Sequence, residues 1–332
     1  MPAEYRILKP EDIPHPANGK FALDILEGLT KTPKQTMPVY FYDAKGSELF
    51  QRITESPEYY LTQAEFDILT EQRFALAKLF GQQTFNLIDL GAGDGRKTTV
   101  LLKGFLEYGL KFRYVPIDVS EQAMRQLLKS LAHEVADLRL ETTGLVAEYF
   151  DAIRWLQGNN GGRNVVLFLG SNIGNFNALE SRSFLRCLQS ALNADDYLLI
   201  GFDLKKDPGI IERAYNDAAG LTREFNLNLL DRLNRELGAD FDRNRFVFRS
   251  QYNVRLGAVE SWLISTQAQQ VRIEALKHAF SFKAWEGILT EYSYKYSIDE
   301  IECLAAETGF RLEQIYLDRR HDYFVDALLR VT

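Results

Sequence analysis

The middle of the chain alternates short apolar runs with longer segments in which apolar residues recur every three or four positions. The run "FNLIDL" at 85–90 is predominantly apolar, as in a parallel strand whose two faces are both buried. Strands are predicted in the same way at 112–120, within 138–150, within 164–176 and at the end of 181–204. Helices are predicted at 96–109, at 121–135 and at the start of 181–204. This alternation predicts an α/β fold with a doubly wound parallel sheet.

The pattern changes on both sides of this region. Pro57 disfavours a helical conformation at the residue before it, so the segment 57–61 is predicted to be a turn. Helices are predicted before the alternating region at 19–31, 46–55 and 62–80. After it, a polar helical region at 211–235 and strand-like runs at 246–253 and 259–266 suggest an inserted antiparallel element. A helix at 297–310 and strands at 311–318 and 323–331 are predicted to return to the sheet.

A length of 332 residues favours about two domains. We predict a larger domain that holds the parallel sheet and comprises residues 64–205 plus 296–332. A second, smaller α+β domain is predicted to comprise residues 1–63 plus 206–295, beginning with an irregular lead-in that contains one helix.

Composition and charge narrow the range of partners. The formal net charge of −7 argues against a nucleic-acid binder that relies on general electrostatic attraction. No apolar run approaches the roughly 18 residues that a membrane span needs, and the polar N-terminal segment lacks the apolar core of a signal peptide. We therefore expect a cytoplasmic protein whose partner is neither a nucleic acid nor a membrane.

Cysteine and histidine give little indication of redox or metal chemistry. Cys187 and Cys303 lie far apart in helix-like patterns, so two buried free thiols are expected. The four histidines are scattered, and no pair has the spacing of metal ligands. No metal site is predicted.

A glycine-rich loop follows the predicted strand 85–90. In "DLGAGDG", Gly91, Gly93 and Gly95 are spaced G-x-G-x-G, with Asp89 two residues before the first glycine. Glycines at the tip of a parallel strand allow positive φ angles and a close approach of the backbone to a ligand. The dinucleotide fingerprint is G-x-G-x-x-G. The different spacing favours a ligand without a pyrophosphate.

This loop resembles motif I of the class I S-adenosylmethionine-dependent methyltransferases, which have a Rossmann-like fold. Asp118 ends the next predicted strand, where a carboxylate accepts two ribose hydroxyls well. After the third strand, Glu148 is a candidate acceptor for the adenine amino group and Tyr149 a flat apolar wall. The resemblance implies S-adenosyl-L-methionine as cofactor, bound by Gly91, Gly93, Lys97, Asp118, Glu148 and Tyr149.

The segment "FYDAKGSELFQRITESPEYYLTQAE" (41–65) resembles the histidine Nα-methyltransferase family, which makes the trimethylated betaine of histidine on the route to ergothioneine. Further matches are "LGSNIGNF" (169–176), "AYNDAAGLTREFN" (214–226) and "TEYSYKY" (290–296). The resemblance runs from about residue 20 to the end of the chain. It implies a small-molecule amino-acid substrate and a monomeric enzyme. In place of Glu148–Tyr149 the family more often has Asp-Phe, which is a conservative difference.

The resemblance also implies roles for individual residues. Asn175 and Tyr215 match the residues that bind the substrate carboxylate in the family, and Glu291 and Ser293 match its imidazole-binding pair. Residues i and i+2 of a strand share a face, so this pair is able to bracket one ring. The aromatic residues expected to line the substrate pocket are Tyr59, Tyr42 and Phe50. Methyl transfer depends mainly on alignment and desolvation, so no dedicated catalytic base is predicted.

One position leaves the substrate open. Ser261 stands where the histidine enzymes often carry a methionine packed near the imidazole. A smaller residue leaves room for tryptophan, tyrosine or a prenylated tryptophan. Glu291 and Ser293 favour histidine instead, because a buried carboxylate without an N–H partner is costly.

Two rival classes of function remain. A nicotinamide-dependent oxidoreductase uses the same type of sheet, but the glycine spacing disfavours it. A non-catalytic module that binds an adenosyl ligand is the other alternative. The presence of Asn175, Tyr215, Glu291 and Ser293 argues against that alternative.

Overall fold

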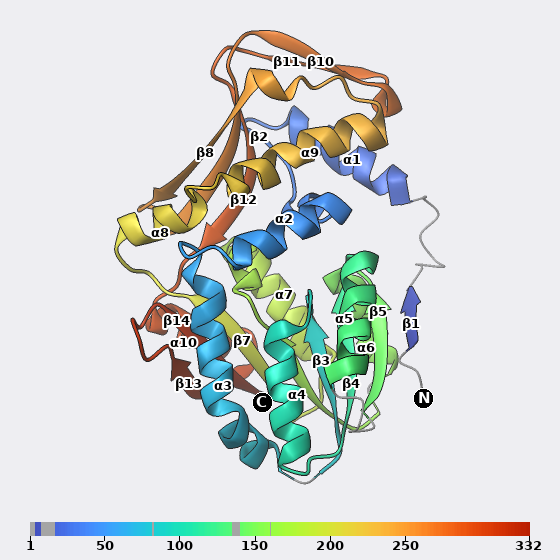
Figure 1. Ribbon diagram of the computed structural model, residues 1–332, viewed down its shortest axis with the longest axis vertical. Coiled ribbons are helices and arrows are strands. Elements are labelled where there is room, and N and C mark those ends of the chain that lie inside the picture. Colours follow the sequence, from blue (N-terminus) through green and yellow to red (C-terminus); the bar gives the residue numbers. More distant parts are fainter. Residues whose placement is uncertain (1–3, 8–16, 82, 135–139, 160) are drawn as a thin grey trace. The chain divides into compact units, whose positions relative to one another are not determined.

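The computed structural model describes residues 4–7, 17–81, 83–134, 140–159 and 161–332 (Figure 1). The chain divides into two compact units. The first comprises residues 1–9, 60–205 and 295–332, and the second comprises 10–59 and 206–294. The first unit includes a short strand, β1 (Glu4–Ile7), in a stretch that the sequence pattern assigned to the irregular lead-in of the other domain. Four residues are too few for a periodic pattern to reveal.

The first unit is built on one eight-stranded sheet in the order β1-β5-β4-β3-β6-β7-β14-β13. The strands up to β7 run parallel, and β14 and β13 complete the sheet as an antiparallel hairpin. Their bounds are β3 (Phe85–Leu90), β4 (Phe112–Asp118), β5 (Glu141–Val146), β6 (Arg163–Phe168), β7 (Tyr197–Asp203), β13 (Phe310–Leu317) and β14 (Phe324–Val331). The predicted doubly wound sheet is confirmed. Its strand order reverses between β3 and β6, where such folds bind ligands.

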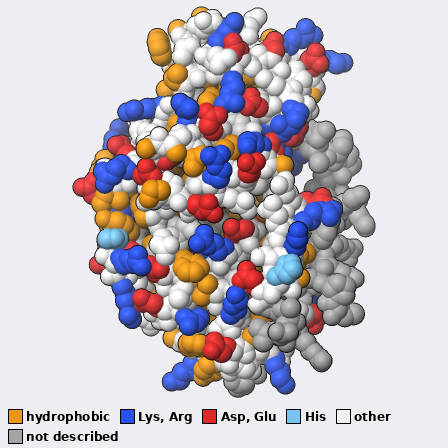
Figure 2. Space-filling view, in the orientation of Figure 1, with side chains coloured by type: hydrophobic (Ala, Val, Ile, Leu, Met, Phe, Trp, Pro, Cys, Tyr) orange, Lys and Arg blue, Asp and Glu red, His pale blue; other side chains and the backbone are white. Residues whose placement is uncertain are grey.

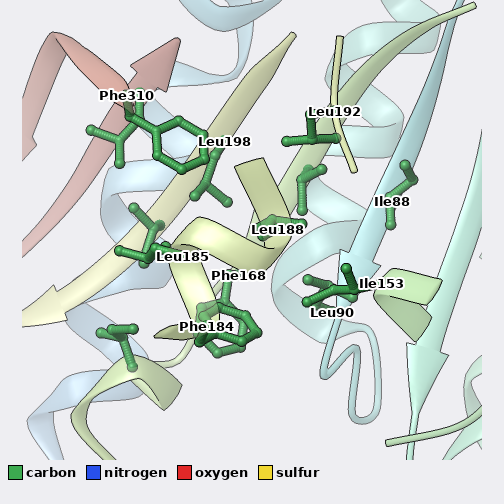
Figure 3. Close-up of a cluster of buried hydrophobic side chains, with 14 of the residues drawn as sticks. Ile88, Leu90, Ile153, Phe168, Phe184, Leu185, Leu188, Leu192, Leu198 and Phe310 are labelled. Carbon is green, nitrogen blue, oxygen red and sulfur yellow. The ribbon is translucent and has the colours of Figure 1, made fainter. Parts of the chain in front are cut away.

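Helices cover both faces of this sheet. One face packs against α3 (Tyr60–Phe80), α4 (Arg96–Glu107) and α5 (Glu121–Glu134). The other packs against α6 (Tyr149–Gly158), α7 (Ala178–Ser190) and α10 (Ile298–Glu307). Successive residues of one strand alternate between the two cores, Leu87 facing α3–α5 and Ile88 facing α6–α7. Figure 3 shows the second core, where Phe168 and Phe184 lie beside Leu185.

Two sequence expectations need correction in the first unit. The third strand, Glu141–Val146, lies within the predicted range, but the pattern did not predict helix α6, which begins at Tyr149. Residues 135–139 lie outside the described part of the chain. Cys187 and Cys303 are free, but Cys187 is half-buried and Cys303 is exposed. The expectation of two buried thiols was wrong, because neither side chain points fully into the core from its helix.

The second unit combines helices with two small sheets around its own core. Its sheet has the order β2-β12-β9-β8, and β10 pairs with β11 in a separate hairpin. The helices are α1 (Ala17–Thr30), α2 (Ala44–Thr54), α8 (Pro208–Tyr215) and α9 (Leu221–Leu237). The strands are β2 (Lys34–Gln35), β8 (Phe246–Asn253), β9 (Ala258–Ser265), β10 (Gln269–Ile273), β11 (His278–Phe282) and β12 (Gly287–Tyr294). The predicted antiparallel element is present as β8, β9 and β12.

Asp43 explains much of the "YDAKGSELF" motif. Its carboxylate caps helix α2 by accepting the Gly46 amide at 2.7 Å, and it accepts Asn228 Nδ2 at 2.8 Å from helix α9. A Cβ atom on Gly46 would lie 1.7 Å from the Phe41 carbonyl oxygen, so this position requires glycine. The acid and the glycine of the motif therefore fix the local fold.

A buried ion pair joins residues near two of the points at which the chain leaves or enters the first unit. Lys295 Nζ lies 2.8 Å from Asp203 Oδ2, and both side chains are fully buried. The hydroxyl of Tyr60 donates to the same carboxylate at 2.9 Å. Tyr60 and Lys295 begin two segments of the first unit, and Asp203 lies close to the end of a third. One carboxylate thus anchors three chain segments in the first unit.

The polarity of the surface is mixed. On the face drawn in Figure 2, acidic and basic side chains of the described residues are intermingled. No helix in the described part of the chain has both the length and the apolar character needed to cross a membrane.

Lys295→Met should destabilise the protein strongly, because it leaves the buried Asp203 without its cation. Breaking one side of a buried pair costs about 3–5 kcal/mol, which corresponds to a fall in Tm of at least about 6 °C. Thermal unfolding measures this. Lys103→Met is the matched control, since its pair with Glu134 is 48% and 42% exposed, and it should shift Tm by less than about 3 °C. Equal shifts in the two variants would contradict the buried pair's structural role.

Candidate functional site

The glycine loop lies at the point where the order of the large sheet reverses. Gly91, Gly93 and Gly95 have φ angles of 78°, 57° and 72°, the left-handed region that favours glycine. A Cβ on Gly91 would lie 2.9 Å from the Tyr149 hydroxyl and 3.0 Å from Asn172 Nδ2. A Cβ on Gly93 would meet no atom of the described part of the chain within 4 Å. The loop is therefore packed against the protein at Gly91 and open at Gly93.

Asp118 sits beside the open part of the loop, at the carboxyl end of β4. Its Oδ2 accepts the Gly93 amide at 2.8 Å and its Oδ1 accepts the Ser120 amide at 2.8 Å. Burial raises the pKa of this carboxyl, and the backbone hydrogen bonds offset part of the rise. Each oxygen retains capacity for a second hydrogen bond. The arrangement suits a pair of ligand hydroxyls, such as those of a ribose.

Asp89, the first acid of the motif, has a structural role. It is buried and accepts hydrogen bonds from Thr98 Oγ1 at 2.6 Å and from the Tyr114 hydroxyl at 2.8 Å. Burial raises its pKa to about 6. Asp89 therefore ties β3 to helix α4 and strand β4, beneath the loop.

Glu148 and Tyr149 lie where helix α6 begins. Glu148 is the N-cap residue, but its side chain makes no capping hydrogen bond. The Tyr149 ring packs edge-on against Phe168 at 5.2 Å and Phe184 at 5.9 Å between centroids. Burial raises the pKa of the Tyr149 hydroxyl well above its usual range. Tyr149 thus forms a neutral, half-buried wall next to Gly91.

Lys97 has a partner that the sequence did not reveal. Its ammonium forms an ion pair with Glu65 of helix α3, whose side chain is fully buried. The backbone amide of Gly170, after strand β6, donates to Glu65 Oε1 at 2.7 Å. Lys97 is therefore held at the carboxyl edge of the sheet by α3 and by the loop after β6.

In the second unit, the predicted aromatic residues contact one another in series. Their ring centroids are 5.5 Å apart for Tyr42–Phe50, 6.3 Å for Phe50–Tyr59 and 6.2 Å for Tyr59–Tyr215. Phe225 joins this group, 5.6 Å from Tyr42 and 5.8 Å from Phe50. The sequence analysis did not single out Phe225, although it lies in the motif "AYNDAAGLTREFN".

The aromatic series ends at the polar pair predicted for the imidazole. The Tyr215 hydroxyl and Ser293 Oγ are 2.7 Å apart in a buried hydrogen bond. Glu291 lies two residues away on the same strand, with a register irregularity just before it. The structure thus brings together Tyr59, Tyr215 and Ser293, with Glu291 beside them on β12.

A row of residues crosses the sheet at Glu291. Ser261 of β9 is the register partner of Glu291, and Ser250 of β8 is the partner of Ser261. Both serines are buried, and Ser250 Oγ has no hydrogen-bond partner among the described residues. Register partners share a face of the sheet, so Ser261 lies next to Glu291 and Ser250 is one strand further along the same row. Ser250 was not identified from the sequence.

Asn175 belongs to the first unit, in the short helix Asn172–Asn175 that follows β6. Tyr215, its predicted companion at the substrate carboxylate, belongs to the second unit. Each residue is half-buried or buried in its own unit. Within the described residues, no cluster of three or more His, Cys, Asp or Glu side chains is arranged to hold a metal ion.

Comparison with known proteins gives a family-level match. The model of a family described as "Histidine-specific methyltransferase, SAM-dependent" matches residues 21–331. The histidine N-alpha-methyltransferase of Mycolicibacterium smegmatis is 37% identical over 92% of this chain and 94% of its own length. The resemblance found in the sequence motifs is confirmed.

Two further relatives differ in what their names state. The ergothioneine biosynthesis protein 1 of Neurospora crassa is 32% identical over 85% of this chain, which spans 32% of that longer protein. The L-tryptophan methyltransferase trpM of Psilocybe serbica is 28% identical over 92% of this chain and 91% of its own length.

Gly93→Ala should weaken binding of S-adenosylhomocysteine by about tenfold or more, because a methyl group would fill the open space beside Asp118. Gly81→Ala is the matched control: Gly81 also has a positive φ of 69°, and no atom of the described residues lies within 4 Å of its Cβ position. Both variants bear a similar backbone strain of about 1–2 kcal/mol, so their Tm values should fall together. Calorimetric titration distinguishes them. Unchanged affinity in Gly93→Ala would show that the ligand does not approach this loop.

Proposed function

This chain belongs to the S-adenosylmethionine-dependent, histidine-specific methyltransferases, and from that membership we propose that it methylates the α-nitrogen of free L-histidine, as far as the N,N,N-trimethyl betaine. The observation that carries the substrate assignment is the retention of Glu291 and Ser293 on one strand, with Ser293 bonded to Tyr215. A carboxylate beside a hydroxyl matches an imidazole, whose two nitrogens need one acceptor and one further polar partner.

The cofactor fits the residues of the first unit. Asp118 would accept the ribose hydroxyls, Glu148 the adenine amino group, and Tyr149 would cover the adenine face. Lys97 would pair with the carboxylate of the methionyl part. When bound, S-adenosylmethionine supplies an electrophilic methyl group on a sulfonium, which is open to in-line displacement by an amine.

The residues of this chain would orient and desolvate the amino acid. Asn175 and Tyr215 would hold its carboxylate, while Glu291 and Ser293 would hold its ring. The rings of Tyr42, Phe50 and Tyr59 would exclude water, and tyrosine faces tolerate a methylated ammonium. No side chain is assigned as a dedicated base, because a neighbouring positive charge lowers the pKa of an amine and favours its neutral, nucleophilic form.

A second candidate substrate is a larger aromatic amino acid such as tryptophan. Ser261, next to Glu291, and Ser250, one strand further along the same row, are small and buried, which favours room for a wider ring. The similarity to a tryptophan methyltransferase supports the same possibility. Glu291 supports histidine as the first candidate, because an indole offers one N–H and no charge to balance a carboxylate.

Incubation with methyl-labelled cofactor and each of the twenty amino acids tests the proposal. We expect label on the α-nitrogen of histidine, with mono-, di- and trimethylated products seen in turn by mass spectrometry. Transfer to tryptophan or tyrosine in preference to histidine would favour the second candidate. The absence of transfer to any amino acid, with the cofactor bound, would overturn the proposal.

Glu291→Gln should raise the KM for histidine by about 10- to 100-fold, since a hydrogen bond to a charged group is worth about 1.5–3 kcal/mol. The Kd for S-adenosylhomocysteine should change by less than about twofold. Glu260→Gln is the matched control. Glu260 is buried on β9, but it is the register partner of Tyr292 and therefore faces the other side of the sheet. Similar KM values in both variants would refute the role assigned to Glu291.

A further inference from the structure

Helix α3, helix α4 and strand β14 bring three ionisable side chains together beneath the carboxyl edge of the large sheet. Glu65 and Asp326 are fully buried, and Lys97 retains 24% exposure of its side chain. Lys97 forms an ion pair with Glu65, whose two oxygens also accept the Gly170 amide at 2.7 and 3.0 Å. The sequence analysis did not single out Asp326, or Glu65, which is the last residue of the motif at 41–65.

Register and glycine geometry place Asp326 next to Glu65. Asp326 of β14 is the register partner of Gly201 on β7. A Cβ on Gly201 would lie 2.3 Å from Glu65 Oε1, so the Glu65 carboxylate lies directly on the Gly201 backbone. Both oxygens of Asp326 are buried, and neither accepts a hydrogen bond from a donor among the described residues.

The cluster has two carboxylates and one ammonium. An ionised, unpaired carboxylate is costly in a protein interior, and a neighbouring carboxylate adds to the cost. Burial first, and then the negative charge of Glu65, raise the pKa of Asp326 well above its usual range, while Lys97 lowers it in part. Burial beside a second carboxylate, without a donor of its own, therefore favours the protonated form of Asp326.

The other described groups that face Asp326 do not offset the cost of ionising its carboxyl. On β13 its register partner is Tyr316, whose own pKa is raised by burial. On β7, Asp203 has Lys295 as its cation. From α3 and α4 the facing charges are Glu65 and Lys97. Among these groups, Lys97 is thus the cation that interacts electrostatically with both Glu65 and Asp326.

We propose that Asp326 is a positioning residue for cofactor binding: its protonated form leaves the Glu65–Lys97 pair neutral, so that Lys97 can receive the carboxylate of S-adenosylmethionine. This rests on the proposed role of Lys97 in binding the cofactor. With Asp326 ionised, the cluster already carries one excess negative charge before the ligand carboxylate arrives. Cofactor affinity should therefore fall as pH rises through the pKa of Asp326.

The test is the Kd of S-adenosylhomocysteine between pH 5.5 and 9 for the wild-type protein and Asp326→Asn. Asparagine is neutral at every pH, so the variant should lack the loss of affinity that the wild-type protein shows on the alkaline side, up to about tenfold per pH unit. The ligand's own amino group titrates equally in both proteins. Identical pH profiles for the two proteins would overturn the proposal.

A second ligand keeps the proposal testable if Asp326→Asn fails to fold. 5′-Methylthioadenosine has the nucleoside but lacks the amino-acid carboxylate, so its affinity for the wild-type protein should vary less than about twofold over the same range. An equal alkaline loss for both ligands would place the pH effect away from Lys97 and contradict the proposal. Failure of S-adenosylhomocysteine to bind at any pH would instead refute the proposed function.

Discussion

Burial of carboxylates near the carboxyl edge of the large sheet is the constraint on which the first unit depends. Asp89, Glu65, Asp203 and Asp326 all face the side covered by α3 and α4, and each is fully or almost fully buried. Three of them have dedicated donors. Asp89 has Thr98 and Tyr114, and Glu65 has Lys97 and the Gly170 amide. Asp203 has Tyr60 and Lys295. Because an unpaired buried charge is so costly, these partners fix where α3, α4 and the loop after β6 must lie.

The same arrangement sets up the edge at which a ligand would bind. Asp89 holds the start of α4 against β3, and the glycine loop between them is crowded at Gly91 and Gly95 and open at Gly93. Lys97 brings a positive charge to this edge, and its ammonium forms an ion pair with the buried Glu65. In the second unit, a single series of aromatic contacts leads to Ser293 and the strand that carries Glu291. The first unit thus holds the residues proposed to bind the cofactor, and the second unit holds most of those proposed to bind the substrate.

Local signals in the sequence predicted much of this. Strand 85–90 and the helix after the glycine loop were found from apolar runs and turn residues, because both depend on short-range pattern. Strand β1 and the hairpin β10–β11 were missed because they are too short to show a period. Helix α6 was missed because its first residues continue the preceding apolar strand pattern.

The residues of the candidate site also divide into those that the sequence indicated and those that it did not. Residues in unusual motifs, such as Tyr59 and Glu291, were identified through resemblance to a family. The partners of buried charges were not, because Glu65 is separated from Gly170, and Tyr60 from Asp203, by more than a hundred residues along the chain. No local pattern indicates which distant strand or helix will supply a counter-charge. Ser250 escaped notice for a similar reason, since only the register of β8 with β9 places it in the row with Glu291.

A crystal structure of the protein with S-adenosylhomocysteine and L-histidine tests the central claim most directly. The account predicts the ribose hydroxyls on Asp118, the homocysteine carboxylate on Lys97, and the imidazole between Glu291 and Ser293. A nucleoside bound away from the glycine loop, or a histidine ring that does not contact Glu291, would contradict it.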